Sequence, residues 1–371
     1  MNTHTINPKL LETIMAGTAR VYHVWVFRWM FCGLLLLVAL SVGGCSQPKG
    51  VIFEPLETPL IWPPPPETGR IEYVGSLGGE LDLKPAKSFS RSFTETVFGQ
   101  RSSQTMLTPY GVCGDGGDRV FVCDSNAQLV HVFNLESRRY EQWKPGELDG
   151  GFAQPVGITF DSLGRLLVSD SAAGIIHAFS SAGEHLGTFG EGVLSKPGGI
   201  VTDPSTDRIF VADVGTHQIV VLSFDGELLE RIGQRGIKLG EFNYPTNVAI
   251  GQDGSLYVSD SLNFRVQVFD SDLNPVRQVG EKGDLPGYFS HPKGVSLDRD
   301  GHLYVIDSHF ESVQIFDSQG GLLLSFGQEG HGPGQFWLPT GIHIDQNNLI
   351  WIADSYNQRL QVFRYLPEDQ H

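Results

Sequence analysis

Short runs of alternating apolar and polar residues, separated by turn-forming residues, fill the chain from about residue 108 onward. One segment shows the arrangement clearly, with such runs at Val248–Ile250, Ser255–Ser259, Arg265–Phe269 and Pro275–Val279. An Asp-Gly pair at 253–254 separates the first two runs and is typical of a tight hairpin turn. Alternation with a period of two is the pattern of a β-strand. The segment therefore predicts four consecutive strands joined by turns.

This four-stranded unit recurs along the chain. An aspartate ends the second strand of each copy, at Asp124, Asp170, Asp213, Asp260, Asp307 and Asp354. A proline lies 15 or 16 residues before each of them, at Pro109, Pro155, Pro197, Pro245, Pro292 and Pro339. By subtraction, successive aspartates are 46, 43, 47, 47 and 47 residues apart. A nearly fixed period of this length indicates a repeat architecture.

The repetition decides how a conspicuous polar triplet is interpreted. The same residue types stand at the same offsets in two units, as Asp260, Asn263 and Arg265 and as Asp354, Asn357 and Arg359. An active site occurs once in a chain, whereas this triplet belongs to a repeated unit. Asp and Asn favour turns because their short side chains hydrogen-bond to nearby backbone groups. We therefore expect the six aspartates and both triplets to be structural.

Six such units predict an all-β fold, namely a six-bladed β-propeller with four strands in each blade around a central channel. The sixth unit stops after its third strand, Arg359–Phe363, whereas a strand-like segment near residues 70–77 ("GRIEYVGSL", 69–77) stands alone. We expect this N-terminal strand to pair with Arg359–Phe363. That pairing closes the ring and leaves no open sheet edge there.

The repeated motif can be written as Pro-x-Gly, then Asp-x-x-Gly, then (Tyr/Trp)-(Val/Ile)-x-Asp-Ser-x-Asn-x-Arg-(Val/Leu)-Gln-Val-Phe. It resembles the NHL repeat, and the resemblance covers about residues 108–365. The resemblance implies the propeller fold. It says little about function, because this fold hosts many activities.

The first 45 residues have the features of a targeting segment. Two arginines precede an apolar run, Trp29–Val42, that ends in "SVGGC". The small residues before Cys45 resemble a bacterial lipobox, which implies cleavage after Gly44 and a lipid-modified Cys45 as the mature N-terminus. Two acyl chains on a cysteine give stable membrane anchoring. The alternative is an uncleaved membrane anchor that begins near Val21.

The chain accordingly divides into a signal peptide (1–44), the lipidated cysteine with a proline-rich spacer (45–69) and the propeller (70–371). The spacer contains four consecutive prolines, Pro63–Pro66, which favour an extended polyproline II conformation. Apolar residues spaced by four, from Phe89 to Val97, predict a short amphipathic helix near 84–99. The expected location is the bacterial cell envelope, with the lipid-anchored protein facing the periplasm or the exterior.

Charge narrows the range of partners. The chain has a net charge of −16, whereas nucleic-acid binding depends on basic patches that neutralise phosphates. The NHL propellers of animal tripartite-motif proteins bind RNA, but this sequence shows no comparable basic stripe. We therefore expect no nucleic-acid partner.

Two cysteines fall on the first two strands of the first unit, Cys113 and Cys123. An export signal permits a disulfide, and bridging requires the two residues to lie nearly opposite each other. The sequence leaves a disulfide and two buried thiols as alternatives. No Cys-x-x-Cys motif occurs in the chain, so we expect no structural zinc site.

A metal site in the channel is the main catalytic hypothesis. The peptidyl-hydroxyglycine amidating lyases resemble NHL propellers and hold a metal by histidines at the channel mouth. Among the residues beside the six strand-opening prolines only His291 is a histidine, and His343 lies on a first strand. One histidine does not make a three-ligand site, and the six aspartates are too far apart across the channel to share one ion. We expect no cofactor, with calcium or zinc in the channel as the alternative.

In a four-stranded meander, the loops that enter first strands and the loops that join second and third strands share one face, here called the contact face. Its residues vary from unit to unit, as a binding surface requires, and the candidates are Tyr110, Tyr244, His291, Lys293, Trp337 and Tyr356. The repeated Phe of the Gly-x-Phe motif is expected to pack between blades instead, at Phe242, Phe289 and Phe336.

These features favour a membrane-tethered, non-catalytic propeller that binds an envelope protein as a scaffold. The alternative is a metal-dependent hydrolase or lyase with its site in the central channel.

Overall fold

The computed structural model describes residues 50–84, 104–146 and 149–367. The expected signal peptide, Cys45 and nearly all of the helix expected near 84–99 lie outside these residues. Within the described ranges, no helix is long and apolar enough to cross a membrane. By its internal contacts the chain divides into two units, and the one that contains Val51–Pro85 and Ser103–His371 holds the described fold.

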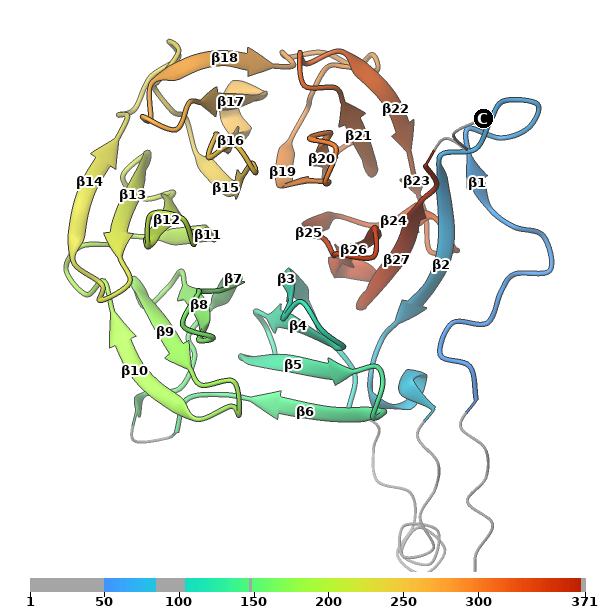
Figure 1. Ribbon diagram of the computed structural model, residues 1–371, viewed down its shortest axis with the longest axis horizontal. Coiled ribbons are helices and arrows are strands. Elements are labelled where there is room, and N and C mark those ends of the chain that lie inside the picture. The colour runs from blue at the N-terminus through green and yellow to red at the C-terminus, as the bar shows by residue number, and fades with distance from the viewer. Residues whose placement is uncertain (1–49, 85–103, 147–148, 368–371) are drawn as a thin grey trace, which may run out of the picture. The chain divides into compact units, whose positions relative to one another are not determined.

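Six antiparallel sheets surround a central axis, and each sheet is one blade of a β-propeller (Figure 1). Each blade begins with a strand next to the axis. These first strands are β3 (Pro109–Gly114), β7 (Pro155–Phe160), β11 (Pro197–Asp203), β15 (Pro245–Ile250), β19 (Pro292–Leu297) and β25 (Pro339–Ile344). The all-β, six-bladed prediction is therefore confirmed.

The remaining strands follow outward in chain order. The second strands are β4 (Arg119–Asp124), β8 (Leu166–Asp170), β12 (Arg208–Asp213), β16 (Leu256–Asp260), β20 (Leu303–Asp307) and β26 (Leu349–Asp354). The third strands are β5 (Leu129–Asn134), β9 (Ile175–Phe179), β13 (Gln218–Ser223), β17 (Arg265–Phe269), β21 (Ser312–Phe316) and β27 (Arg359–Tyr365). The outer strands of the first five blades are β6 (Arg139–Trp143), β10 (His185–Phe189), β14 (Leu228–Ile232), β18 (Pro275–Val279) and β22 (Leu322–Phe326).

The N-terminal strand closes the ring, as predicted. β2 (Ile71–Leu77) pairs antiparallel with β27 and becomes the fourth strand of the sixth blade, with Tyr73 opposite Phe363 and Leu77 opposite Leu360. Figure 1 shows this N-terminal strand beside the C-terminal one. The hydroxyl of Ser355 also donates to the carbonyl of Pro109 at 2.6 Å, which joins the sixth blade to the first near the axis.

The structure differs from the expected spacer over residues 51–69. A two-residue strand, β1 (Ile61–Trp62), pairs with the outer side of β2. The Trp62 ring lies 5.7 Å from the Phe326 ring and 5.9 Å from the Phe363 ring, and Phe53 packs 6.2 Å from Trp351. Burial of these large apolar side chains is favourable. This part of the proline-rich segment is therefore attached to the propeller.

Packing between blades explains the burial pattern of the strands. Every residue of β16 and β17 is buried because neighbouring blades cover both faces of each sheet, whereas in the outer strand β14 only Ile232 is buried. One cluster of buried apolar side chains fills each of the six spaces between neighbouring blades. The hydrophobic core is thus a ring of six similar layers.

The glycine of the Pro-x-Gly motif permits the first strands to approach one another. A Cβ atom at Gly111 would lie 2.3 Å from the carbonyl oxygen of Val156 in the next blade, and one at Gly341 would lie 2.2 Å from that of Tyr110. Such distances are far below van der Waals contact, so these positions require glycine. The repeat therefore specifies the narrow inner wall of the ring.

Short elements complete the described fold. Single 3₁₀ turns are η1 (Glu80–Leu83), η3 (Ser261–Asn263) and η4 (Ser355–Asn357). A small parallel ladder joins β23 (Gln328–Glu329) to β24 (Gln335–Phe336) in the loop before the sixth blade.

Candidate functional site

The six repeated aspartates hold the loops that enter the first strands. Each lies at the end of a second strand and is completely buried. The Asp260 carboxylate accepts a hydrogen bond from the backbone N–H of Asn243 at 2.6 Å, and that of Asp354 from Trp337 at 2.8 Å. The other four aspartates accept equivalent bonds from residues 107 and 108, 153 and 154, 195 and 196, and 290 and 291. These buried carboxylates therefore hold the loops of the contact face in place.

The two polar triplets form closed networks around their aspartates. Oδ2 of Asp260 accepts hydrogen bonds from Asn263 at 2.7 Å, Arg265 at 3.0 Å and Gln267 at 3.0 Å. Burial raises the pKa of Asp260, and the opposing effects of Asn263 and Arg265 do not cancel it. The equivalent bonds around Asp354 come from Asn357, Arg359 and Gln361. These hydrogen bonds engage both carboxylates in structural contacts.

The loops of the contact face are tied to each other within each blade. The loop that joins the second and third strands donates a backbone hydrogen bond to the loop that enters the first strand, as from Ser261 to Tyr244 at 3.3 Å and from Tyr356 to Trp337 at 3.1 Å. Ser308 donates to His291 in the same way at 3.1 Å. The structure therefore brings the two kinds of loop to one face.

An aromatic pair stands exposed on the contact face. The rings of Trp337 and Tyr356 lie 5.6 Å apart, and their exposed fractions are 43% and 57%. The ring of His331 meets Trp337 edge-on at 5.0 Å. Tyr244 is 38% exposed, and its backbone N–H donates to Nδ1 of His217 at 3.1 Å. These aromatic residues are both accessible and held by local contacts.

The repeated phenylalanines are not part of this surface. Phe242, Phe289 and Phe336 are completely buried. Each packs on the phenylalanine of a third strand, with ring centroids 5.8, 5.6 and 5.8 Å apart respectively. They pack within the clusters between blades.

Tyr110 and Lys293 lie at the mouth of the channel. Nζ of Lys293 is 5.9 Å from the centre of the Tyr110 ring. Burial lowers the pKa of Lys293 and raises that of Tyr110. Neither residue is among the well-exposed side chains, so they form the inner part of the contact face rather than its rim.

A surface pocket of about 310 Å³ opens beside this mouth, which we call the mouth pocket. It is lined by Ser290, His291, Lys293, Ser308, His309 and Leu338. Burial, followed by the charge of Lys293, lowers the pKa of His291. Nearby, Oε2 of Glu311 accepts the backbone N–H of Leu338 at 2.7 Å, and burial raises the pKa of Glu311 to about 7.

Sequence reasoning identified His291 and Lys293 of this pocket and missed His309, which lines it, and Glu311, which bonds to Leu338 of its wall. Their signal was the departure of the fifth unit from the repeat. The fourth unit reads "DSLNFR" after its second strand, whereas the fifth reads "DSHFES". A unit that loses the repeated Asn and Arg is a place where a non-structural role can be sought.

The channel itself is lined by the first strands and encloses about 290 Å³. His343 lies in its wall, where burial lowers the pKa of the imidazole to about 4. His291 lines the mouth pocket instead. The structure therefore does not place these two histidines in one cavity.

Cys113 and Cys123 are buried free thiols in the structure. In the ladder between β3 and β4, Cys113 lies opposite Phe121. Phe121 is two residues before Cys123, so the two cysteines are not opposite each other. Burial raises the pKa of both thiols.

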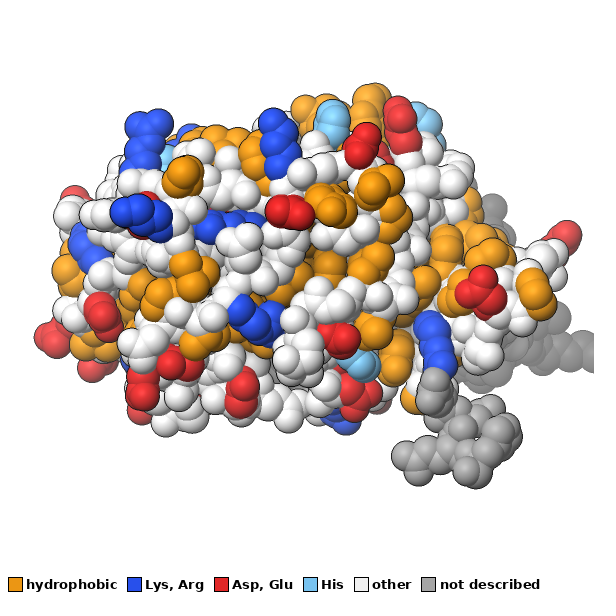
Figure 2. Space-filling model, turned by 90° about the horizontal axis from the view of Figure 1, so that it is seen from above, with side chains coloured by type: hydrophobic (Ala, Val, Ile, Leu, Met, Phe, Trp, Pro, Cys, Tyr) orange, Lys and Arg blue, Asp and Glu red, His pale blue; other side chains and the backbone are white. Residues whose placement is uncertain are grey.

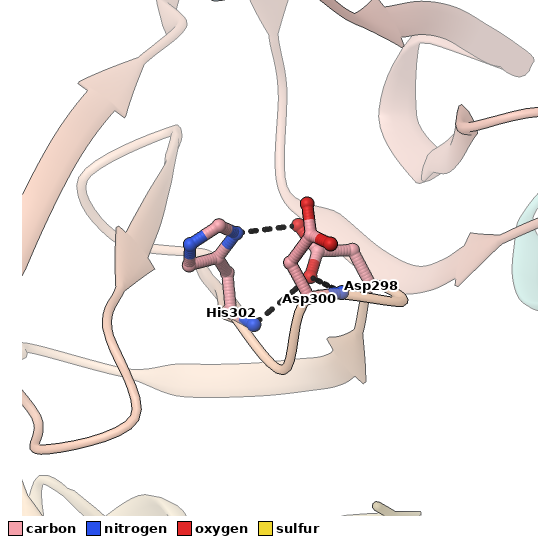
Figure 3. Close-up of side chains that lie close together, drawn as sticks. All are labelled: Asp298, Asp300 and His302. Atoms are coloured by element: carbon pink, nitrogen blue, oxygen red, sulfur yellow. Dashed lines mark hydrogen bonds and ion pairs between the residues drawn. The ribbon is translucent and has the colours of Figure 1, made fainter. Parts of the chain in front are cut away.

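One group of three potential metal ligands occurs among the described residues, consisting of Asp298, Asp300 and His302. Figure 3 shows these side chains close together, and all three belong to the turn between β19 and β20. Asp298 accepts hydrogen bonds from the backbone N–H groups of Asp300 at 3.0 Å and His302 at 2.9 Å, and its other oxygen lies 2.8 Å from Nδ1 of His302. These contacts make the group part of a turn.

Charged side chains are distributed unevenly over the rim of the propeller. The turns between first and second strands carry Asp115, Asp161, Asp253, Asp298 and Asp345, and Asp203 ends β11 beside its turn. Three of these aspartates pair with arginines at the same turns. The contact-face loops on the opposite side carry both signs, with Lys196, Lys238 and Lys282 alongside Glu191, Glu241 and Glu281. Figure 2 shows the rim, with Asp and Glu gathered along its lower edge and Lys, Arg and His more frequent along its upper edge.

Comparison with known proteins supports the fold. The NHL repeat family matches residues 194–222, 242–269 and 336–363, in the third, fourth and sixth blades. No curated protein matches the sequence at a significant level. The protein is therefore a six-bladed β-propeller, and three of its blades match the NHL repeat.

Several solved structures share this fold. A virginiamycin B lyase from Staphylococcus aureus is 17% identical, with a TM-score of 0.52 over 70% of this chain and 96% of that chain. A gluconolactonase from Xanthomonas campestris is 16% identical, with a TM-score of 0.54 over 79% and 98%. An auxiliary nutrient binding protein from Bacteroides ovatus is 12% identical, with a TM-score of 0.56 over 71% and 70%. Identities this low show a common fold and nothing further.

Proposed function

We propose that this propeller is a non-catalytic binding module that holds another protein on its contact face. The observation that carries the proposal is the Trp337–Tyr356 pair, which is exposed yet fixed by ring packing and by the backbone hydrogen bond between the two residues. Aromatic residues are enriched at protein interfaces and often provide most of their binding energy. A rigid, exposed pair loses little conformational entropy on binding.

Further apolar side chains extend this surface across the fourth and fifth blades. Ile237 is 77% exposed, Leu285 63% and Leu262 40%, and all three lie in loops of the contact face. Soluble proteins seldom expose contiguous apolar patches unless a partner covers them. These side chains would add to the binding area of the aromatic pair.

The partner that we propose is a protein of the bacterial cell envelope. The proposal rests on the lipobox-like sequence before Cys45, which would place two acyl chains at the mature N-terminus. The propeller would then remain attached to a membrane while its contact face stays available. The net charge of −16 argues against nucleic acid as the partner.

The alternative, a metal-dependent hydrolase or lyase in the channel, has less support. His291 and His343 line different cavities, and a catalytic zinc site needs three protein ligands. The alternative is still tested, because two solved structures with this fold are named as enzymes, a lyase and a gluconolactonase. Stoichiometric zinc or calcium in the purified protein, lost in His343→Ala, would favour it.

The binding proposal is tested by cross-linking the tagged full-length protein in intact cells and identifying what is captured. Trp337→Ala/Tyr356→Ala removes the aromatic pair. The matched control, Leu228→Ala/Leu323→Ala, removes two residues of similar exposure, 45% and 52%, from the outer strands. We expect one partner to be captured by the wild type and the control and to be lost by the aromatic variant. Equal capture by both variants, or no specific capture by the wild type, would contradict the proposal.

A further inference from the structure

The ammonium of Lys293 has no charged partner within the described part of the chain. Its one close contact is the Tyr110 ring, 5.9 Å from Nζ, and Glu311 acts on it only at longer range. Lys293 is half-buried, and withdrawing a charge from water without a partner is unfavourable, so such groups are usually paired. The ammonium faces the mouth pocket, from which a ligand can reach it.

The repeat shows that this lysine is not needed for folding. The residue after the strand-opening proline is Thr246 in the fourth blade and Thr340 in the sixth. Their hydroxyls lie 2.7 and 2.8 Å from the hydroxyls of Ser261 and Ser355 in the same blade. In the fifth blade Lys293 stands at this position, and the hydroxyl of Ser308 donates to the carbonyl of Pro339 at 2.5 Å. Packing alone therefore gives no reason for a lysine here.

The other lining groups include several hydrogen-bond donors. Burial and the nearby Lys293 lower the pKa of His291. His309 lines the same pocket, as do Ser290 and Ser308. An imidazole N–H and a hydroxyl can each donate one hydrogen bond to an anion. The pocket thus combines an ammonium with several hydrogen-bond donors.

We propose that the mouth pocket binds a single carboxylate group, with Lys293 as its counter-ion and His291 and His309 as hydrogen-bond donors. A monoanion matches one ammonium, whereas a phosphate dianion would leave a negative charge uncompensated beside Glu311. The inference rests on the proposed binding function and specifies its chemistry. The carboxylate comes from the partner, either as an Asp or Glu side chain or as the C-terminus.

The test uses full-length protein labelled with ¹³C in its histidine rings and follows His291 and His309 by NMR during titration with sodium propionate. The spectra of His291→Gln and His309→Gln assign the two signals. We expect saturable shifts of both signals with propionate and none with propionamide, its neutral counterpart. Lys293→Met should weaken propionate binding about tenfold or more, because a charge-assisted hydrogen bond is lost.

Lys282→Met is the matched control, because Lys282 lies over the Phe264 ring on the same face and outside the pocket. It should leave propionate affinity within about twofold of the wild type, a difference too small to reflect a lost hydrogen bond. Unchanged propionate binding in Lys293→Met, or no saturation up to about 100 mM, overturns the proposal. Tighter binding of inorganic phosphate than of propionate also overturns it.

Two peptides distinguish the possible sources of the carboxylate. One is an amidated tetrapeptide with a single internal Asp, and the other is an all-Ala tetrapeptide with a free C-terminus. The peptide that binds more tightly identifies the source of the carboxylate. Loss of binding of both peptides in Lys293→Met supports the site. Failure of the partner capture described above would leave the propionate result unaffected, so the two proposals can fail separately.

Discussion

Arg265 donates from Nε to Oδ2 of Asp260 at 3.0 Å, and both side chains are almost completely removed from solvent. The same guanidinium reaches the carbonyl oxygens of Lys238 at 2.7 Å and Glu241 at 3.0 Å, in the loop before the first strand of its blade. One buried ion pair therefore ties the third strand to the second strand and to a contact-face loop. The triplet that resembles a catalytic set connects the blade to one of its contact-face loops.

Asp260→Ala should destabilise the protein strongly. The substitution leaves Arg265 buried without its carboxylate, and breaking a buried pair in this way lowers the free energy of unfolding by about 3–5 kcal/mol. Thermal unfolding followed by circular dichroism measures the effect. Asp272→Ala, in an exposed turn of the same blade, is the control and should change stability by less than about 0.5 kcal/mol. An unchanged melting temperature together with lost binding would instead make Asp260 a functional residue.

The fold could be predicted from the sequence because each repeated residue has a repeated physical role. Pro-x-Gly marks a first strand, the aspartate ends a second strand, and an isolated N-terminal strand matches the strand missing from the last unit. Six copies make an accidental match improbable. A single copy of "DSLNFR" could not have been distinguished from an active site.

The candidate site was predictable only in part. His291 and Lys293 stand beside a repeated proline, where comparison of the units points to variable residues, whereas His309 and Glu311 lie in a loop that departs from the repeat without indicating a site. The sequence does not predict that residues 51–69 pack on the propeller, because four consecutive prolines are typical of a stiff spacer. Phe53 and Trp62 were the available signal, since large apolar residues are rarely left in a solvated linker.

Removal of the N-terminal strands should open the ring. A chain that starts at residue 78 lacks β1 and β2, which leaves the edge of β27 unpaired and the core residues Phe363 and Phe326 exposed. An unpaired apolar edge strand promotes aggregation. We expect this chain to aggregate on size-exclusion chromatography.

A chain that starts at residue 50 is the matched control for this truncation. It retains β1, β2 and the contact of Phe53 with Trp351. It should elute as a single soluble species with the melting temperature of the longer protein. A chain that starts at residue 70 separates the two contributions, because it keeps β2 but lacks β1 and the contacts of Trp62 and Phe53. Equal stability of the chains that start at 50 and 70 would show that residues 51–69 contribute nothing to the fold.

Glu311 should make stability decrease as the pH rises toward neutrality. Burial raises the pKa of its carboxyl to about 7 from the ordinary 4.5. Between these values the folded state binds more protons than the unfolded state, so the free energy of unfolding falls with increasing pH. The stabilising contribution of the Glu311 carboxyl to the folded state is complete below about pH 4.5 and lost above about pH 7.

The measurement is the difference in melting temperature between pH 5 and pH 8. In Glu311→Gln this difference should be smaller than in the wild type, because the amide does not ionise and its oxygen still accepts the N–H of Leu338. Glu230→Gln, an exposed substitution on the outer strand β14, controls for the general effect of removing a negative charge. Identical pH dependence in the wild type and Glu311→Gln would contradict the burial of this carboxyl.

Cys113 and Cys123 should react with a thiol reagent only when the protein unfolds. Both thiols are buried, and burial raises their pKa, so the reactive thiolate is scarce and inaccessible in the folded state. The experiment uses Cys32→Ser/Cys45→Ser, which removes the other two cysteines of the chain. We expect slow reaction with Ellman's reagent under native conditions and two equivalents of thiol in guanidinium chloride without reductant. Zero equivalents in the denatured, unreduced protein would establish a disulfide and show that the ladder between β3 and β4 has a different register.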